Sequence, residues 1–592
     1  MTVNQKIKLL RTQMSQKNIT AYIVPSSDPH QSEYVAERWK SRTWLSGFTG
    51  SAGTIIVTSK HAGLWTDSRY FLQAEAELAD SEIVLHQQKI PHAPEHIHWL
   101  AEHLPKGSTL AMDGSLFSVG HLRFIAKQLA DKDINIVSDI DLVDLVWEDR
   151  PSLPLAPIFE HSIKYTGKSR EEKIAEVKTI MQSKNAQYHF VSTLDDIAWL
   201  LNLRGSDIEF NPLFIAYCLV GQDQTYLYID LTKVSPELQS KLNTDGIILK
   251  SYDSVEIHLQ SLEDSIWIDA SAINVQLYNA LTEEQIIRGH NICRKLKAIK
   301  TPLEIKHIRH AMKKDGVALL RLFRWLEATL EDRGVTEYEL AEKLAGFRAQ
   351  QEVYFGESFP AIVGYKGNGA IVHYRPLPDS SATIQKDGIL LLDSGGQYLD
   401  GTTDITRTVA LGTPTAEQKR NFTLVLKGYI TLELAKFPVG TTGVQLDTLA
   451  RMHLWQDGLN YGHGTGHGVG FFLNVHEPPQ GFATGATTSR GTTALEPGML
   501  TSNEPGFYKT DEYGIRVENL ILCKMYKETP YGKFLASEPL TLFPIDTNLI
   551  NFDLLNETET QWLKDYHQKV WEGLSPMLEE EEKKWLADYI HF

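Results

Sequence analysis

The chain has 592 residues, enough for about three or four domains of typical size. Hydrophobic residues make up 42% and charged residues 22%, as in ordinary folded globular proteins, and the net charge of −17 argues against non-specific binding to nucleic acid or an anionic membrane. The three widely spaced cysteines, Cys218, Cys293 and Cys523, form no CxxC pair, so neither a zinc knuckle nor a disulfide framework is predicted.

The first 20 residues have the pattern of a polar, amphipathic helix with Ile7, Leu10 and Met14 on one face. They lack the apolar centre of a signal peptide, and no run of about 18 apolar residues occurs anywhere in the chain. We therefore expect no membrane span and a cytoplasmic location, with which the sparse cysteines also agree.

Two segments of the first half of the chain resemble each other. Residues 9–26 and 176–193 each predict a helix followed by a short buried strand. The identical pairs are Thr12 with Thr179, Met14 with Met181, Lys17 with Lys184, Asn18 with Asn185, and Val24 with Val191. Residues 44–51 match 199–206 in the same way, at an offset of 155 instead of 167, a difference of 12 residues. The repetition predicts a duplicated α/β domain.

Two sequence features mark domain boundaries. Residues 150–157 contain three prolines in eight residues, which is typical of an extended linker. After Lys300 a helix should begin, with Thr301 as its N-cap, Pro302 at the first helical position and Glu304 positioned to complete a capping box.

These boundaries predict domains at 1–155, 156–300 and 301–592. The first two are α/β. The third is α+β, because long helical patterns at 303–350 come before short strands separated by glycines. We expect a helical C-terminal extension of this third domain from about residue 530, with the helical pattern itself returning from about residue 556.

A glycine- and threonine-rich hairpin is predicted at residues 388–408. Asp393 ends one apolar run and Asp404 begins the next, and an ionised carboxylate beside a core is costly unless it is paired or binds a cation. Each aspartate alone is also typical of a turn or cap. A tight Asp400-Gly401 turn would bring Asp404 opposite Gln397, so a shared site predicts a longer loop or a bulge.

Three histidines, His463, His467 and His476, fall within 14 residues. The glycines between the first two argue against a helix and therefore against the helical HExxH zinc motif. Glycine also lets the backbone pass close to a ligand. Packing alone does not readily explain three histidines in such a segment.

A second hairpin is predicted at residues 502–520. If it is centred on Asp511, Glu504 and Glu518 lie opposite one another. Each glutamate alone is unremarkable. Together with the two aspartates they make four carboxylates, which match the charge of two divalent cations.

An oxygen-rich ligand set with one imidazole suits Mn²⁺, and Zn²⁺ or Co²⁺ are alternatives. Two such ions can share a water, lower its pKa and present hydroxide to a peptide carbonyl. The pattern therefore predicts a two-metal hydrolase.

At these motifs the sequence resembles the creatinase/aminopeptidase P family of "pita-bread" metallopeptidases. Asp, Asp, His, Glu, Glu is that family's ligand order, and the match is close around DSGGQYLDGTTDITRT, HGTGHGVG, NEPG and GIRVEN. Residues 46–53, 65–71 and 194–206 resemble the N-terminal domains of the long, three-domain members. The resemblance implies two duplicated creatinase-like domains followed by a pita-bread catalytic domain.

The resemblance also implies a ligand set. Asp393 and Asp404 would bind one metal ion, and His467 and Glu504 would bind the other. Asp404 and Glu518 would bridge the two ions.

Further roles are implied for residues around the metals. Glu504 would take the proton of the attacking water, and Arg516 would orient the ligands. His373 would help to bind substrate and stabilise the tetrahedral intermediate. His476 would lie near the scissile carbonyl, and His463 would shape a proline pocket.

The activity implied by the resemblance is removal of the first residue from peptides with a penultimate proline. Three alternatives remain: a prolidase acting only on dipeptides, a creatinase, and a non-catalytic binding protein on the same fold. Prolidases usually have one N-terminal domain, and creatinases lack the metal ligands. The long family members are commonly homodimers, so we expect a homodimer formed largely through the C-terminal domain, with no nucleic acid or membrane partner.

Overall fold

The computed structural model describes residues 1–89, 94–485 and 488–591. The chain forms two compact units, the first of Met1–Ile163 with Lys168–Arg294 and the second of Lys164–Gly167 with Lys295–Phe592. The first unit contains most of the two predicted N-terminal domains, and the second contains the predicted third domain. The exact three-domain division remains a prediction.

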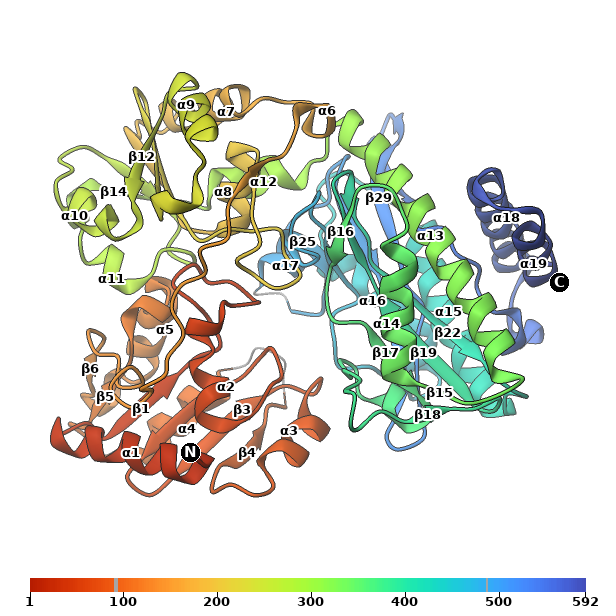
Figure 1. Ribbon diagram of the computed structural model, residues 1–592, viewed down its shortest axis with the longest axis horizontal. Helices are drawn as coiled ribbons and strands as arrows, with labels where there is room; N and C mark the ends of the chain where they lie inside the picture. The colour runs from red at the N-terminus through yellow and green to blue at the C-terminus, as the bar shows by residue number, and fades with distance from the viewer. Residues whose placement is uncertain (90–93, 486–487, 592) are drawn as a thin grey trace. The chain divides into compact units, whose positions relative to one another are not determined.

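In the described part of the first unit, two six-stranded sheets share one topology (Figure 1). The first sheet has the order β4-β3-β2-β1-β5-β6, and the second has the order β12-β11-β10-β8-β13-β14. The strands of the first sheet are β1 (Ala21–Val24), β2 (Thr54–Thr58), β3 (Ala62–Thr66), β4 (Val84–Gln87), β5 (Thr109–Ala111) and β6 (Asn135–Val137). Those of the second are β8 (Tyr188–Val191), β10 (Tyr217–Gly221), β11 (Thr225–Ile229), β12 (Ile247–Ser251), β13 (Ile266–Ile268) and β14 (Ile286–Arg288).

Strand directions also agree between the two sheets. Strands β1 and β8 each pair antiparallel with the next strand of their sheet and parallel with β5 and β13, respectively. Each outer strand, β4, β6, β12 and β14, pairs parallel with its neighbour. This common order and direction confirms the duplication predicted from the sequence.

The helices around the first strands repeat as well. Helices α1 (Val3–Gln16) and α7 (Arg170–Gln182) precede β1 and β8, and α1 buries the three apolar residues predicted for its inner face. Helices α2 (Ser41–Ser46) and α8 (Leu194–Leu201) end at Gly47 and Asn202, both in the left-handed conformation that these residue types tolerate. The predicted linker at residues 150–157 has no regular secondary structure.

The second unit begins its main fold with helix α13 (Pro302–Leu330). The N-cap Thr301, the first-turn Pro302 and the capping box with Glu304 are all present as predicted. Helices α14 (Glu337–Arg348), α15 (Ala416–Leu434) and α16 (Gly443–Gln456) follow.

The strands of the second unit carry or directly adjoin the predicted metal ligands. A three-stranded sheet contains β17 (Ile362–Tyr365), β19 (Ile389–Ser394) and β22 (Ile405–Ala410). A six-stranded sheet has the order β23 (Lys436–Pro438), β30 (Gly532–Pro539), β29 (Asn519–Thr529), β26 (Leu500–Asn503), β24 (Gly466–Gly468) and β25 (Glu477–Phe482). A separate hairpin is formed by β27 (Gly506–Lys509) and β28 (Tyr513–Arg516). Strands β16 (Tyr354–Glu357), β20 (Gly396–Tyr398) and β21 (Gly401–Thr402) complete another small sheet.

The predicted longer loop or bulge between Asp393 and Asp404 is wrong. Strands β20 and β21 pair Tyr398 with Gly401, which leaves a two-residue turn one position earlier than Asp400-Gly401. In the same register, Asp393 lies opposite Thr406. Asp404 precedes Thr406 by two residues, and alternate residues of a strand share a face. The two aspartates are thus diagonal neighbours, and no extra residue is needed to bring them together.

The second predicted hairpin is confirmed. Gly506 pairs with Arg516 and Lys509 with Tyr513, so the hairpin is centred on Asp511, whose φ is 61°. Strands β26 and β29 continue the same register with Asn503 opposite Asn519. Glu504 and Glu518 therefore face each other between the two paired stretches.

The C-terminal extension is only partly helical. Residues from 532 onward first form β30, whose ladder with β29 joins them to the six-stranded sheet, so a helical extension from about 530 is incorrect. Helices α18 (Glu557–Leu574) and α19 (Glu580–Ile590), in dark blue in Figure 1, confirm the predicted return to helix from about residue 556.

A large hydrophobic cluster holds the second unit together. Leu322 of α13, Leu390 of β19, Val425 of α15 and Leu563 of α18 are all fully buried in it. Each such side chain contributes about 1.5–3 kcal/mol relative to exposure in water. Among the described residues, no helix is long and apolar enough to cross a membrane.

Candidate metal centre

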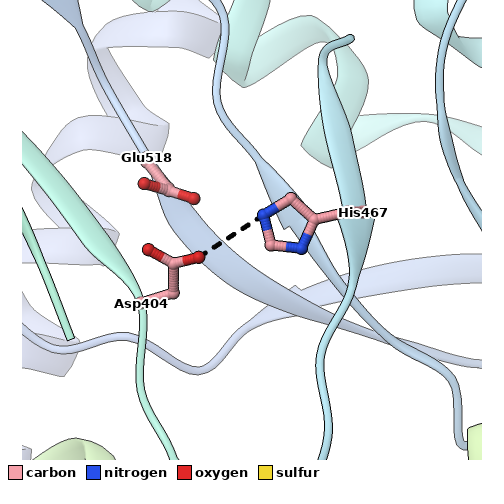
Figure 2. A group of neighbouring side chains, drawn as sticks. All are labelled: Asp404, His467 and Glu518. Atoms are coloured by element: carbon pink, nitrogen blue, oxygen red, sulfur yellow. Dashed lines mark ion pairs between the residues drawn. The ribbon is translucent and has the colours of Figure 1, made fainter. Parts of the chain in front are cut away.

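Three predicted ligands converge from separate elements of the second unit. Asp404 immediately precedes β22, His467 lies on β24, and Glu518 lies between β28 and β29. One potential ligand atom from each residue lies within 4.8 Å of the others, and all three side chains are buried (Figure 2). These three residues could therefore hold a cation between them.

The imidazole of His467 is oriented toward the carboxylates. Its Nδ1 lies 3.0 Å from the carbonyl oxygen of Gly468, which can only accept, so Nδ1 carries the hydrogen. Its Nε2 lies 3.4 Å from Asp404 Oδ2, the dashed contact in Figure 2, and 3.5 Å from Glu504 Oε1. Burial lowers the pKa of His467 to about 3. The ring is therefore neutral near pH 7 and directs a lone pair toward two carboxylates, as a metal ligand does.

The two glutamates face this imidazole and each other. The Glu504 backbone N–H donates to Thr465 at 2.8 Å, and its carboxylate is the most accessible of the site at 18% exposed. Glu518 accepts a hydrogen bond of 2.7 Å from the hydroxyl of Thr406. Burial raises the pKa of both carboxyls, and for Glu518 the neighbouring carboxylates raise it further.

Asp393 is held by the predicted arginine. Arg516 Nη2 donates to Asp393 Oδ2 at 2.6 Å, while Oδ1 is buried and has no hydrogen-bond partner in the described part of the chain. A buried carboxylate oxygen without a partner is costly, and a cation would satisfy it.

The charges of the centre do not balance. Asp393, Asp404, Glu504 and Glu518 lie together with the fully buried guanidinium of Arg516 and the neutral imidazole of His467. Burial, followed by repulsion from Asp393, raises the pKa of Asp404 well above its usual range. Positive charge at His476, Arg516 and Arg348 opposes the rise in the pKa of Asp404 but does not cancel it. Four carboxylates in so small a buried space are not stably ionised without added positive charge. Divalent cations would supply it.

The remaining predicted histidines border the same region. His463 Nε2 lies 2.8 Å from the hydroxyl of Tyr508, and the ring of His476 meets that of His467 edge-on at a centroid distance of 4.2 Å. His373 is partly buried in the loop after β17, and its neighbour Val372 accepts a hydrogen bond from Arg516 at 3.4 Å. The loop that carries His373 therefore reaches the arginine of the centre.

Two contributing residues were missed by the sequence reasoning. Tyr508 accepts from Arg516 Nη1 at 2.7 Å and so joins His463 to the arginine that holds Asp393. Thr406 accepts from Arg516 Nε at 3.0 Å and donates to Glu518. The alternation of strand residues could have identified both, because residues an even number of positions apart in a strand lie on the same face. Tyr508 is four residues from Glu504, and Thr406 is two residues from Asp404.

Sequence profiles of known families cover most of the chain. The profile of metallopeptidase family M24 matches residues 306–525, and that of the C-terminal region of peptidase M24 matches residues 533–591. Two profiles of the creatinase/prolidase N-terminal domain match residues 6–146 and 149–304, in agreement with the duplicated sheets.

Full-length relatives are also similar. A protein of Laccaria bicolor named probable Xaa-Pro aminopeptidase P is 42% identical over 98% of this chain and 91% of its own. Xaa-Pro aminopeptidase 1 of Dictyostelium discoideum is 40% identical over 99% of this chain and 96% of its own. A crystal structure of an X-prolyl aminopeptidase from Caenorhabditis elegans, described as a cytosolic enzyme with a di-nuclear active site, matches all of both chains with 34% identity and a TM-score of 0.95.

Proposed function

The chain belongs to metallopeptidase family M24, and we propose that it removes the first residue from peptides whose second residue is proline. It is a metal-dependent Xaa-Pro aminopeptidase. The main structural support for this function is the buried cluster of four carboxylates around one neutral imidazole, whose negative charges are not balanced by the protein. Full-length similarity to named aminopeptidases, through both N-terminal domains, favours this activity over that of a prolidase.

Two divalent metal ions serve the centre, and we assign Mn²⁺ as the native metal. The donors fit such ions, because Asp393 Oδ1 is buried without a hydrogen-bond partner among the described residues and His467 directs its Nε2 lone pair inward. A set of carboxylate oxygens with one nitrogen favours Mn²⁺, with Zn²⁺ and Co²⁺ as alternatives. When bound, the ions lower the pKa of a shared water and polarise the peptide carbonyl.

We assign Asp393 and Asp404 to one ion, His467 and Glu504 to the other, and Asp404 and Glu518 to both. Support comes from the position of His467 Nε2 between Asp404 and Glu504, and from the approach of Glu518 to the same space. Arg516 would keep Asp393 in its orientation through the 2.6 Å hydrogen bond.

We further assign Glu504 as the base that accepts the proton of the attacking water. Its carboxylate is more accessible than those of Asp393 and Asp404, at 18% against 9% and 5%, and burial raises its pKa toward the value that suits a general base. The proton would then pass from Glu504 to the leaving proline nitrogen.

The histidines would bind and orient the peptide. His476 lies against His467 and is assigned to the scissile carbonyl, and His373 to the tetrahedral intermediate. His463, bonded to Tyr508, is assigned to the proline pocket. The bond to proline is a tertiary amide without an N–H, so a site that binds it cannot depend on that hydrogen bond.

The function is tested with purified protein, Mn²⁺ and four substrates: a Xaa-Pro dipeptide, a Xaa-Pro-Yaa tripeptide, the matching Xaa-Ala-Yaa tripeptide, and creatine. We expect release of the first amino acid from the proline tripeptide and little from its alanine counterpart. Hydrolysis confined to the dipeptide would identify a prolidase. Metal binding without hydrolysis of any of the four would identify a binding protein.

We also infer a cytoplasmic homodimer built through the second unit. The end of the β29–β30 hairpin exposes Met525, Tyr526 and Tyr531 at 47%, 48% and 93%, and an apolar hairpin end of this kind suits a subunit contact. Light scattering after size exclusion should give twice the mass of the chain. The double substitution Tyr526→Asp and Tyr531→Asp should reduce it to one, and an unchanged dimer would exclude this contact.

A further inference from the structure

Two histidines of the first unit meet on one face of its first sheet. His61 lies in the turn just before β3, His86 lies on the edge strand β4, and their Nε2 atoms are 3.0 Å apart. Both side chains are partly exposed, so solutes can reach them from water. Neither residue belongs to the peptidase centre.

Aromatic rings hold both imidazoles in position. The ring of Trp65 stacks on His86 with a centroid distance of 4.0 Å and an interplanar angle of 7°. Trp99, on helix α4 (Glu95–His103), stacks on His61 at 4.7 Å and 30°. Stacking removes rotamer freedom from both rings before any ligand arrives, which lowers the entropic cost of binding.

Gly63 provides the space in which the two rings meet. A Cβ at this position would lie 2.6 Å from His61 Nε2 and 2.8 Å from His86 Cδ2. Only glycine therefore permits this approach without a shift of the histidines.

The protonation state leaves nitrogen lone pairs available. Burial is the main cause that lowers the pKa of both histidines, to about 4 for His86. Both rings are thus neutral near pH 7. The nearby cation Arg11 is paired with Glu82 at 2.7 Å, which offsets much of its repulsion toward a bound ion.

We propose that His61 and His86 together bind one divalent transition-metal ion of the imidazole-preferring class, Cu²⁺, Ni²⁺ or Zn²⁺, through their two Nε2 atoms. Two nitrogens about 2.1 Å from one ion and roughly at right angles are about 3 Å apart, which is the separation present here. Water completes the coordination. The hydrogen that the two Nε2 atoms otherwise share would move to Nδ1 of its own ring, so both imidazoles stay neutral and both Nε2 lone pairs become available to the ion.

This site differs in selectivity from the peptidase centre. Its donors are imidazoles alone, whereas the peptidase centre is dominated by carboxylate oxygens. Imidazole favours Cu²⁺, Ni²⁺ and Zn²⁺, whereas carboxylates suit Mn²⁺. The two kinds of site can therefore be distinguished by metal as well as by position.

The test counts Ni²⁺ bound per chain by equilibrium dialysis of the full-length protein preloaded with Mn²⁺. Wild type is compared with His86→Gln, His61→Gln and the control His98→Gln, which removes an exposed histidine of α4. Wild type and the control should bind one more Ni²⁺ than either site variant, or bind the last equivalent at least tenfold more tightly. Cu²⁺ EPR should show nitrogen coupling that the site variants lose.

Hydrolysis of a proline tripeptide with Mn²⁺, which should be equal in all four proteins, reports that each variant is folded. If one of the two site variants is not folded by this measure, the other variant still tests the proposal, because it also removes one of the two nitrogen donors. Equal Ni²⁺ stoichiometry and affinity in wild type and a folded site variant would overturn the proposal and leave the pair as a hydrogen bond between histidines.

Discussion

Two buried clusters of charged side chains lie on opposite faces of strand β19. Asp393 points into the metal centre, whereas the next residue, Ser394, accepts a hydrogen bond of 3.0 Å from Arg348. Arg348 is fully buried and also donates to Asp315 at 2.8 Å and to Glu357 at 2.6 Å. Each face combines carboxylates with a fully buried arginine, Arg348 on one and Arg516 on the other.

The two clusters differ in whether the buried carboxylate oxygens have hydrogen-bond partners. In the Arg348 cluster, Tyr398 donates to Asp315 and Tyr354 to Glu357, so each acid has several donors. In the metal centre, Arg516 donates to Asp393 Oδ2, but Oδ1 of the same buried carboxylate has no hydrogen-bond partner among the described residues. A satisfied cluster stabilises the fold, whereas an unsatisfied cluster marks a binding site that costs stability until its cations are bound.

The largest effect should come from Asp404→Asn. Loss of the ligand that we assign to both ions should reduce peptidase activity by more than about 10³-fold and lower the bound metal, measured by metal analysis. The metal-free variant should nevertheless be at least as stable as metal-free wild type, because burial and Asp393 raise the pKa of Asp404 and make its charge costly. Asp315→Asn is the matched control on the other face. It should keep its metal but lose stability. Normal turnover of Asp404→Asn with two ions bound would refute the ligand assignment.

Arg348→Met should give the opposite result in the metal-free protein. It leaves Asp315 and Glu357 buried without their cation, so the free energy of unfolding should fall by about 3–5 kcal/mol. Denaturant unfolding of both proteins after chelation measures the difference. If Arg348→Met were as stable as wild type, the hydrogen bonds and ion pairs of the buried acids would not explain the difference between the two clusters.

A smaller effect is expected for Glu337→Gln, a buried acid that is satisfied without any metal. Its carboxylate accepts from the backbone N–H of Tyr365 and Ala382, both at 2.8 Å, and from the Tyr374 hydroxyl beside His373. The amide cannot accept all of these bonds, so the His373 loop should loosen, at a cost of about 1–3 kcal/mol. We expect kcat/KM to fall about tenfold with unchanged metal content. Loss of metal instead would place Glu337 among the residues that support the ligands.

The smallest effect should come from Glu538→Gln, at a partly exposed acid. A hydrogen bond from Arg309 is the main cause that lowers the pKa of Glu538, to about 2 from an ordinary value of 4.5. Its contribution to stability is therefore present above about pH 4.5 and is lost as the pH falls toward 2. The variant should be less stable than wild type by less than about 1 kcal/mol at pH 7. Unfolding curves should show a smaller difference in stability between wild type and the variant at pH 4 than at pH 7. A larger difference at pH 4 would contradict the ion pair between Arg309 and Glu538.

Much of the fold was predictable because its signals are local. Thr301, Pro302 and Glu304 start α13 through contacts within one helical turn. The hairpin centred on Asp511 follows from strand alternation on either side of a short turn, and that register alone brings Glu504 opposite Glu518. The duplicated sheets were recognisable because both copies keep matching residues in their first helix and strand.

The errors arose where distant groups decide the local structure. A longer loop or bulge was predicted because the only tight turn considered was the Asp400-Gly401 turn that local propensity favours. In the structure, Asp400 is bound by Lys314 at 2.6 Å and lies 2.9 Å from His310 Nδ1. With these contacts from α13 in place, the turn is formed by Leu399 and Asp400, one residue before Asp400-Gly401. In the same way, β30 joins β29 by a ladder that no pattern within residues 530–540 reveals.

The sequence by itself therefore determined the helix starts, the hairpin at Asp511, the duplication, and which acids and histidines stand at strand ends. Only the tertiary structure decided that Asp393 and Asp404 lie diagonally on one face, that His467 directs Nε2 rather than Nδ1 toward the carboxylates, and that Tyr508 connects His463 to Arg516. The reason is separation along the chain: the bond between Arg516 and Asp393 spans 123 residues, and such contacts exist only once the core has packed and excluded water from both partners.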